Sequence, residues 1–143
     1  MVRIEKSIEI KAPPKKVWEM LALDRQPEWM EGWKSVKFAS EVSTPEDKYR
    51  VGASAHITEH VKYDFEITES LENEKITFRS EKYSMVRSYT LKPTEAGTEV
   101  VDVFEYTSPY SILGKIVDKS FGQRIAEKEV EKSLEKLKSI LEK

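Results

Sequence analysis

Hydrophobic and polar residues alternate along the first ten positions of the chain. Every even-numbered residue from Val2 to Ile10 is apolar except Lys6, and the intervening positions are polar. A period of two is typical of a strand with one buried face. The pattern therefore predicts a strand over residues 2–10 and places Lys6 on its apolar face.

Two short helical segments are predicted after this strand. Pro14 suits a first helical turn, because the N–H that proline lacks would have no partner there. Val17, Trp18 and Leu21 then recur at helical spacing, which predicts a helix over residues 14–23. One further helical turn is predicted over residues 28–32.

Six more strands are predicted from alternating segments separated by turn residues such as Pro45, Asn73 and Gly97. The connections between them are short, which favours antiparallel pairing, because a parallel crossover needs about a dozen residues or more. The predicted strands cover residues 35–41, 52–60, 61–71, 75–81, 85–93 and 98–107.

A helical pattern begins after Pro109. Apolar residues recur there at intervals of three to five, which predicts a helix over residues 111–142. An uninterrupted helix of that length would extend about 48 Å at about 1.5 Å per residue, so we expect a break or a 3₁₀ start near Gly114 or Gly122.

Together these elements predict an α+β fold in a single domain over residues 1–143. A curved seven-stranded antiparallel sheet wraps around the long C-terminal helix, with two short helices after the first strand. One helix cannot fill the concave face of such a sheet. The arrangement therefore predicts a space for a ligand between sheet and helix.

The amino-acid composition excludes several kinds of site and argues against several kinds of partner. The chain has no cysteine, which excludes disulfides, thiolate metal sites and a cysteine nucleophile and fits a cytoplasmic location. Its 24 Lys and Arg residues against 26 Asp and Glu residues argue against a nucleic-acid partner. The charges along the first ten residues lead us to expect no signal peptide, and we expect no stable membrane insertion, because no apolar run is long enough. The 18 Lys and 21 Glu residues, with only three Asn and Gln, are typical of a protein from a thermophile.

The segment His56 to His60 matches the zinc-peptidase signature H-x-x-E-H. That signature needs a helix, whereas this segment alternates like a strand. In a strand the two histidines lie about 13 Å apart, at about 3.3 Å per residue. One zinc ion cannot bind both, so we predict two surface histidines and no metal site.

Three charged residues, Lys6, Arg87 and Asp102, lie on strand faces that are otherwise apolar. Pairing of the first strand with the last sets Lys6 opposite Asp102, and the final hairpin sets Tyr89 opposite Asp102 with Arg87 diagonal to it. We predict a cluster of these four side chains on the cavity floor. The cluster is either a polar anchor for a ligand's carboxylate, carbonyl or phenol, or an ion pair whose charged groups bind only each other.

Aromatic residues on inward positions are more numerous than a small core needs. Trp29 and Trp33 are predicted to form one rim of the cavity, and Tyr110 and Ile112 another. The residues predicted to contact a ligand combine the charged cluster with aromatic and apolar side chains: Lys6, Trp29, Trp33, Tyr63, Phe65, Phe78, Met85, Arg87, Tyr89, Asp102, Phe104, Phe121 and Ile125.

Three motifs, in this order, carry a resemblance to a known family. They are A-P-P-x-x-V-W-x-x-L from Ala12, W-x-x-x-W from Trp29 and Y-T-L-x-P-T-x-x-G-T-x-V from Tyr89. With the order of elements, they resemble the START-like (SRPBCC) superfamily, which includes polyketide cyclase/dehydrase-like, pollen-allergen-like and coenzyme Q-binding proteins. The resemblance covers essentially the whole chain. It implies a helix-grip fold with a deep apolar cavity and does not imply one activity.

The favoured function is binding, with transport or sequestration, of a hydrophobic or amphipathic small molecule such as a lipid, quinone or polycyclic aromatic. No cofactor is predicted, and an oligomeric state does not follow from the sequence. One alternative is a cyclase/dehydratase-type enzyme that uses the same cavity. Another is a protein-interaction module with a nearly filled cavity and an exposed apolar patch around Trp29, Met30 and Trp33.

Overall fold

The computed structural model describes residues 1–59, 62–107 and 119–143. Its seven strands form one antiparallel sheet in the order β1-β7-β6-β5-β4-β3-β2. The first and last strands are therefore neighbours, as the sequence predicts. The strands are β1 (Val2–Ile10), β2 (Ser35–Phe38), β3 (Ser54–Thr58), β4 (Lys62–Leu71), β5 (Lys75–Ser80), β6 (Met85–Pro93) and β7 (Thr98–Tyr106).

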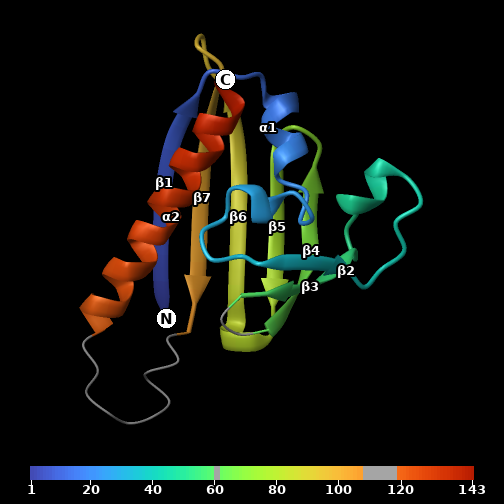
Figure 1. Cartoon of the computed structure of the whole chain (residues 1–143), viewed down its shortest axis with the longest axis vertical. Helices are drawn as coiled ribbons and strands as arrows, with labels where there is room; N and C mark the ends of the chain where they lie inside the picture. Colours follow the sequence, from blue (N-terminus) through green and yellow to red (C-terminus); the bar gives the residue numbers. More distant parts are fainter. Residues whose placement is uncertain (60–61, 108–118) are drawn as a thin grey trace.

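Two α-helices and three short 3₁₀-helices complete the described chain. Both α-helices lie on the same face of the curved sheet (Figure 1), with α2 packed mainly along β1 and α1 against β6. The fold thus confirms the predicted sheet around a C-terminal helix. The helices are α1 (Pro14–Met20), η1 (Gln26–Glu28), η2 (Pro45–Lys48), η3 (Lys82–Ser84) and α2 (Lys119–Leu141).

The short helices differ from their predicted bounds. α1 ends at Met20, where the N–H of Leu21 bonds to the carbonyl of Trp18, and does not continue to Leu23. The next turn is η1, which lies earlier than the predicted turn over residues 28–32. Pro27 explains the shift. A proline is tolerated in the first positions of a helix, because the N–H that it lacks would have no partner there.

α2 continues through Gly122, so the predicted break does not lie at this residue. A glycine inside a helix lowers its stability by about 1 kcal/mol relative to alanine but does not interrupt the hydrogen bonding. Gly114, the other predicted position, lies outside the described residues.

The predicted strand register is confirmed. Lys6 pairs with Asp102 across β1 and β7, and Tyr89 pairs with Asp102 across β6 and β7. Gly97 closes the β6–β7 hairpin against the end of β1. A side chain there would place a Cβ atom 2.2 Å from the carbonyl oxygen of Ile10, so only glycine allows this approach.

The C-terminal half of α2 buries a stripe that includes Val130, Leu134 and Leu137. Ile125 is 46% exposed, so its predicted inward position is wrong. The buried stripe continues instead through Ala126, four residues before Val130, and Ile125 lies about 100° away from Ala126 around the helix.

Polar contacts fasten the C-terminal end of α2 to the sheet. The Lys138 ammonium donates to the carbonyl of Glu9 at 2.8 Å. The N–H of Lys11 donates to the carboxylate of Glu142 at 2.9 Å, and Lys138 also pairs with that carboxylate. The end of the helix is therefore held at the point where β1 ends.

Candidate functional site

A cavity of about 90 Å³ lies between the sheet, α2 and the segment after η1. Pockets for drug-sized ligands measure about 300–1,000 Å³, so this space is much smaller than the deep cavity that the sequence predicts. Large side chains fill the concave face of the sheet, which the residue pattern does not reveal. The cavity is lined by Met30, Glu31, Trp33, Glu59, Tyr63, Phe65, Met85, Arg87, Phe104, Ala126, Glu129, Val130 and Ser133.

A row of aromatic rings crosses the interior from this cavity. Trp33 contacts Phe65 with ring centroids 6.1 Å apart, and Phe65 contacts Phe78 at 5.8 Å. The row continues through Tyr89, which packs edge-on against both Phe78 and Trp29. Aromatic rings are rigid and bury large areas, so this row forms a stiff wall under the cavity.

A buried ion pair lies at the base of the cavity. Arg87 Nε donates to one carboxylate oxygen of Asp102 at 3.1 Å, and Nη2 donates to the other at 2.7 Å. Arg87 is 6% exposed and Asp102 is 0% exposed. Buried charges of this kind are stable only when they are paired and hydrogen-bonded, and the bidentate geometry satisfies both conditions.

Aromatic rings also surround the guanidinium. Its central carbon lies 4.9 Å from the ring centroid of Phe104 and 5.4 Å from that of Tyr89. Burial disfavours the charged guanidinium, but the Asp102 carboxylate more than offsets this effect, so the pKa of Arg87 lies above its usual value. Arg87 is therefore a permanent cation beside the cavity.

The predicted cluster forms only in part, because Lys6 takes a different partner. Its ammonium pairs with Glu131 of α2 at 3.0 Å, and no ion pair joins it to Asp102. The hydrogen bond that Lys6 donates to Glu131 raises the pKa of Lys6, against a smaller opposing effect of burial. Lys6 and Asp102 do face each other in the register, but Asp102 is already bound on both oxygens by Arg87.

Tyr89 lies behind the cavity lining. Its side chain is 0% exposed, and its hydroxyl has no hydrogen-bond partner among the residues that the structure describes. Burial raises its pKa well above the usual value, although the Arg87 charge opposes the shift. The hydroxyl therefore stays protonated.

Tyr63 lines the cavity on the side of β4. Its hydroxyl donates to the Glu59 carboxylate at 3.4 Å. Burial raises the pKa of Tyr63, and the negative charge of Glu59 raises it further. Together with Glu31 and Glu129, Glu59 gives the cavity wall three carboxylates, and Arg87 is the one cation among the described residues that line it.

The structure brings six of the predicted ligand-contacting residues to the cavity wall: Trp33, Tyr63, Phe65, Met85, Arg87 and Phe104. Met30, which the interaction-module alternative placed in an exposed patch, also lines the cavity. Trp29, Phe78, Tyr89 and Asp102 are buried behind it, and Lys6 and Ile125 lie elsewhere. The side chain of Phe121 and the predicted rim of Tyr110 and Ile112 lie outside the described part of the chain. Contact of any of these residues with a ligand stays a prediction.

Sequence reasoning predicted that the C-terminal helix contributes Phe121 and Ile125 to the wall, and it missed the four residues of α2 that line the cavity. Ala126, Glu129, Val130 and Ser133 all line the cavity and follow the i, i+3, i+4, i+7 spacing of one helical face. Ala126 and Val130 belong to the apolar stripe of the helix. The position of that stripe around the helix could therefore have predicted which residues face the cavity. Ser133 additionally accepts the N–H of Glu31 at 2.8 Å and so joins the helix to the cavity rim.

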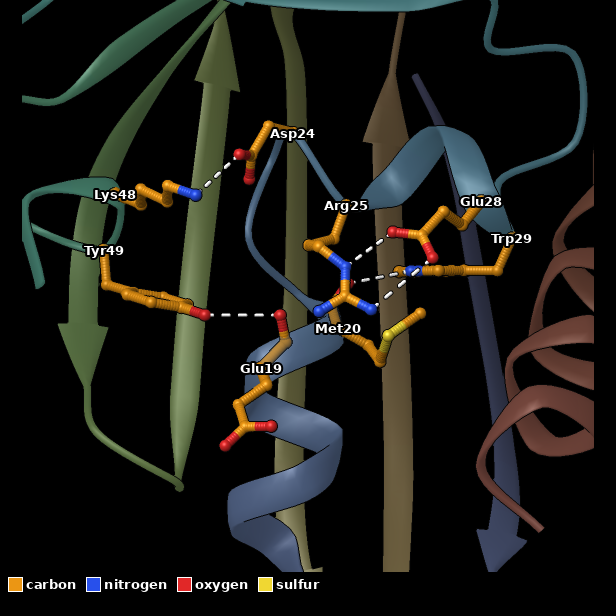
Figure 2. A network of polar contacts seen from close by, with 8 residues as sticks. All are labelled: Glu19, Met20, Asp24, Arg25, Glu28, Trp29, Lys48 and Tyr49. Carbon is orange, nitrogen blue, oxygen red and sulfur yellow. Dashed lines mark hydrogen bonds and ion pairs between the residues drawn. The ribbon is translucent and has the colours of Figure 1, made fainter. Parts of the chain in front are cut away.

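The loop that carries Met30 is fixed from behind by α1. Figure 2 shows the indole N–H of Trp29 donating to the carbonyl of Met20, at 2.8 Å, with the Arg25–Glu28 ion pair beside it. The same view shows the Tyr49 hydroxyl donating to the carbonyl of Glu19 at 3.3 Å. These bonds position the segment that closes one side of the cavity.

The first three residues of the histidine motif, His56 to Thr58, lie on a strand, as predicted. His56 belongs to β3, is exposed and pairs with Asp64 on the outer face of the sheet, and His60 is outside the described residues. Within residues 1–59, 62–107 and 119–143 no three His, Asp or Glu side chains are grouped to hold a metal ion. None of the described helices combines the length and hydrophobicity of a membrane-spanning segment.

Solved structures share this architecture. Protein MLL2253 from Mesorhizobium loti is 19% identical, with 98% of this chain and 96% of that chain covered and a TM-score of 0.71. BH1534 from Bacillus halodurans is 17% identical over 99% and 98% of the two chains, with a TM-score of 0.74. The Aha1 dimer from Colwellia psychrerythraea is 19% identical over 99% and 97%, with a TM-score of 0.71. At these identities the likeness establishes the fold alone.

The sequence comparisons identify the family. No curated protein sequence matches the chain significantly. The family described as polyketide cyclase/dehydrase and lipid transport matches residues 1–142. This match and the shared fold confirm the SRPBCC-type resemblance found in the motifs. The chain therefore belongs to the polyketide cyclase/dehydrase and lipid transport family.

Proposed function

We propose that this protein binds a hydrophobic or amphipathic small molecule between the sheet and α2. The observation that carries the proposal is the cavity itself, where aromatic and apolar side chains surround the guanidinium of Arg87. Mostly apolar walls with a few polar groups are the usual composition of a ligand site, since burial supplies affinity and the polar groups fix orientation. The family description, which includes lipid transport, supports the same function.

The volume of the cavity sets a condition on binding. An engineered cavity of about 150 Å³ takes up a single benzene, so a space of about 90 Å³ has to widen to accept a lipid or a polycyclic aromatic. Met30 is the side chain best suited to move, because methionine is unbranched and adopts many rotamers at low cost. Ala126, opposite it on α2, leaves room in the direction of the helix.

The interaction-module alternative requires an exposed patch around Trp29, Met30 and Trp33. These side chains are 0%, 5% and 7% exposed, so no such patch is present among them, although the small cavity agrees with that alternative. For an enzyme, the acid or base was expected among Lys6, Arg87, Tyr89 and Asp102. Of these, Asp102 has both carboxylate oxygens bound by Arg87. The small cavity volume is therefore the one observation here that favours an alternative, and the burial of Trp29, Met30 and Trp33 argues against that same alternative.

The test is a titration monitored by Trp fluorescence and native mass spectrometry. We expect menadione and laurate, offered separately, to give saturable quenching and a 1:1 adduct for at least one of them. A126F, which fills the cavity from α2, should abolish binding, whereas K128F on the exposed face of the same helix should leave it unchanged. Binding of neither ligand, or equal binding by A126F, would contradict the proposal.

A further inference from the structure

We propose that the ligand of this cavity is an uncharged molecule with an oxygen acceptor, such as the carbonyl of a ketone or quinone, at its inner end. Arg87 Nη1 is the donor to that oxygen, and free carboxylates and phosphates are rejected. This inference rests on the proposed function and specifies its ligand class.

The donor follows from how Arg87 is bound. Its bonds to Asp102 use Nε and Nη2, and no described residue accepts a hydrogen bond from Nη1. Asp102 fixes the plane of the guanidinium, and Arg87 itself lines the cavity. Guanidinium groups donate and never accept, so the ligand group that they bind in this position must be an acceptor.

A purely hydrocarbon ligand satisfies this site poorly. It would exclude water from the Nη1 amino group without replacing the hydrogen bonds that water makes. A buried donor left without a partner is unfavourable, more so when it carries charge. A site with such a donor discriminates strongly against analogues that lack the matching acceptor.

A charged acceptor is disfavoured by Asp102. The single positive charge of the guanidinium is already matched by this carboxylate, which is 0% exposed and 2.7 Å away. A ligand carboxylate would place a second buried anion on the same cation, and two carboxylates that share one site do not both stay ionised without cost. The described residues of the cavity wall add no further cation to compensate, because their other ionisable side chains are Glu31, Glu59, Glu129 and Tyr63.

A matched series of three single-ring ligands separates these effects. Acetophenone carries a carbonyl, α-methylstyrene replaces that oxygen by CH₂, and benzoate replaces the methyl group by an anionic oxygen. Dissociation constants are measured by ligand-observed NMR titration with the wild-type chain at one ionic strength. We expect acetophenone to bind about tenfold or more tightly than each of the other two.

A double variant tests the assignment to Arg87. R87M/D102V removes both charges together, so that no unpaired buried charge remains, and it should bind acetophenone and α-methylstyrene equally. K6M/E131Q removes the other ion pair of the same face and should retain the wild-type preference. Circular dichroism checks that both variants fold. The ranking of the three ligands with the wild-type chain tests the proposal even if a variant does not fold.

The outcomes separate the inference from the proposed function. Benzoate binding as tightly as acetophenone would overturn the rejection of anions, and α-methylstyrene binding as tightly would overturn the polar anchor. Binding of menadione or laurate without binding of acetophenone would also overturn the inference while leaving the proposed function standing. If none of these ligands binds, both are wrong.

Discussion

The two ends of the interior are built from different side chains. The closed end, under α1 and the C-terminal half of α2, is aliphatic, and Ile10, Val17, Leu21, Val100 and Leu137 are each 0% exposed there. The cavity end, under the segment from Met30 to Trp33, contains aromatic rings, the Arg87–Asp102 pair and the unfilled space.

This difference assigns the two roles to different places: the closed end stabilises the fold, and the cavity end is the part that can bind a ligand. Branched aliphatic side chains interlock closely and leave few gaps, so the closed end holds α1 and α2 on the sheet through tight packing. Rigid rings and a fixed ion pair cannot close completely around one another, and a space remains between them. The polar contacts of Lys138 and Glu142 hold α2 at the closed end, so the helix can adapt to a ligand mainly at the other.

Breaking the ion pair from one side should have the largest effect on the cavity end. D102A leaves the guanidinium buried without its partner, and we expect the free energy of unfolding to fall by about 3–5 kcal/mol. Urea denaturation followed by circular dichroism measures this change.

R87M/D102V is the matched control for that loss. Removal of both charges leaves no unpaired group, so the double variant should be close to the wild type in stability or above it. If D102A and the double variant lose the same amount, the loss comes from packing and the ion pair has no special role.

Truncation of apolar side chains compares the two ends directly. L137A creates a new void in a tightly packed region and should cost about 3 kcal/mol or more, within the range for buried leucines. M30A enlarges an existing space whose wall can adjust, and the loss should be smaller. M30A should also bind menadione more tightly than the wild type does. Equal losses of stability in the two variants would show that the cavity end is as tightly packed as the closed end.

Alkaline pH should weaken the contact between α1 and the loop after η2. Burial raises the pKa of Tyr49 from 10.0 to about 12, with the charges of Asp24 and Glu19 adding to the shift. Between these values the unfolded chain loses the phenol proton while the folded chain keeps it, so stability falls as the pH rises from about 10 to 12. Unfolding midpoints measured across this range should fall less steeply for Y49F, and parallel curves would refute the assignment.

The smallest effect is expected from the Lys6–Glu131 pair, whose side chains are 31% and 51% exposed. Ion pairs of this kind gain little because water screens them and their long side chains lose freedom. K6M should leave the urea midpoint almost unchanged, and any difference should vanish in 0.5 M NaCl. If K6M lowered the free energy of unfolding as much as D102A does, the Lys6–Glu131 pair would contribute as much to stability as the buried pair, which would contradict this expectation.

Much of the fold could be predicted because it depends on local patterns. Alternation along residues 2–10 and 98–107 identified the buried face of each strand, and short turns implied antiparallel neighbours. These two facts set Tyr89 opposite Asp102. The pairing of the first strand with the last, which sets Lys6 opposite Asp102, was what the resemblance to the helix-grip fold implied. A shift by one residue would have turned every side chain of β7 to the other face, so the register is strongly specified.

The sequence predicted where the cavity lies, between the sheet and the C-terminal helix, but not its volume. The sequence shows how many large side chains face inward, but the volume they leave depends on the rotamers and crossing angles of elements far apart in the chain. Trp29 illustrates the limit. It was expected at the rim beside Trp33, yet its N–H reaches the carbonyl of Met20 and the ring is completely buried.

The sequence by itself determined the element order, the inward face of each long strand and the approach of three charged residues to one another. Only the tertiary structure decided which of two cations Asp102 binds. Both lie within reach of it in the sheet, but Arg87 presents two parallel donors to the carboxylate, and Glu131 on α2 offers Lys6 a partner. That choice depends on a helix more than a hundred residues from Lys6 in the chain, and periodicity carries no information about contacts over such distances.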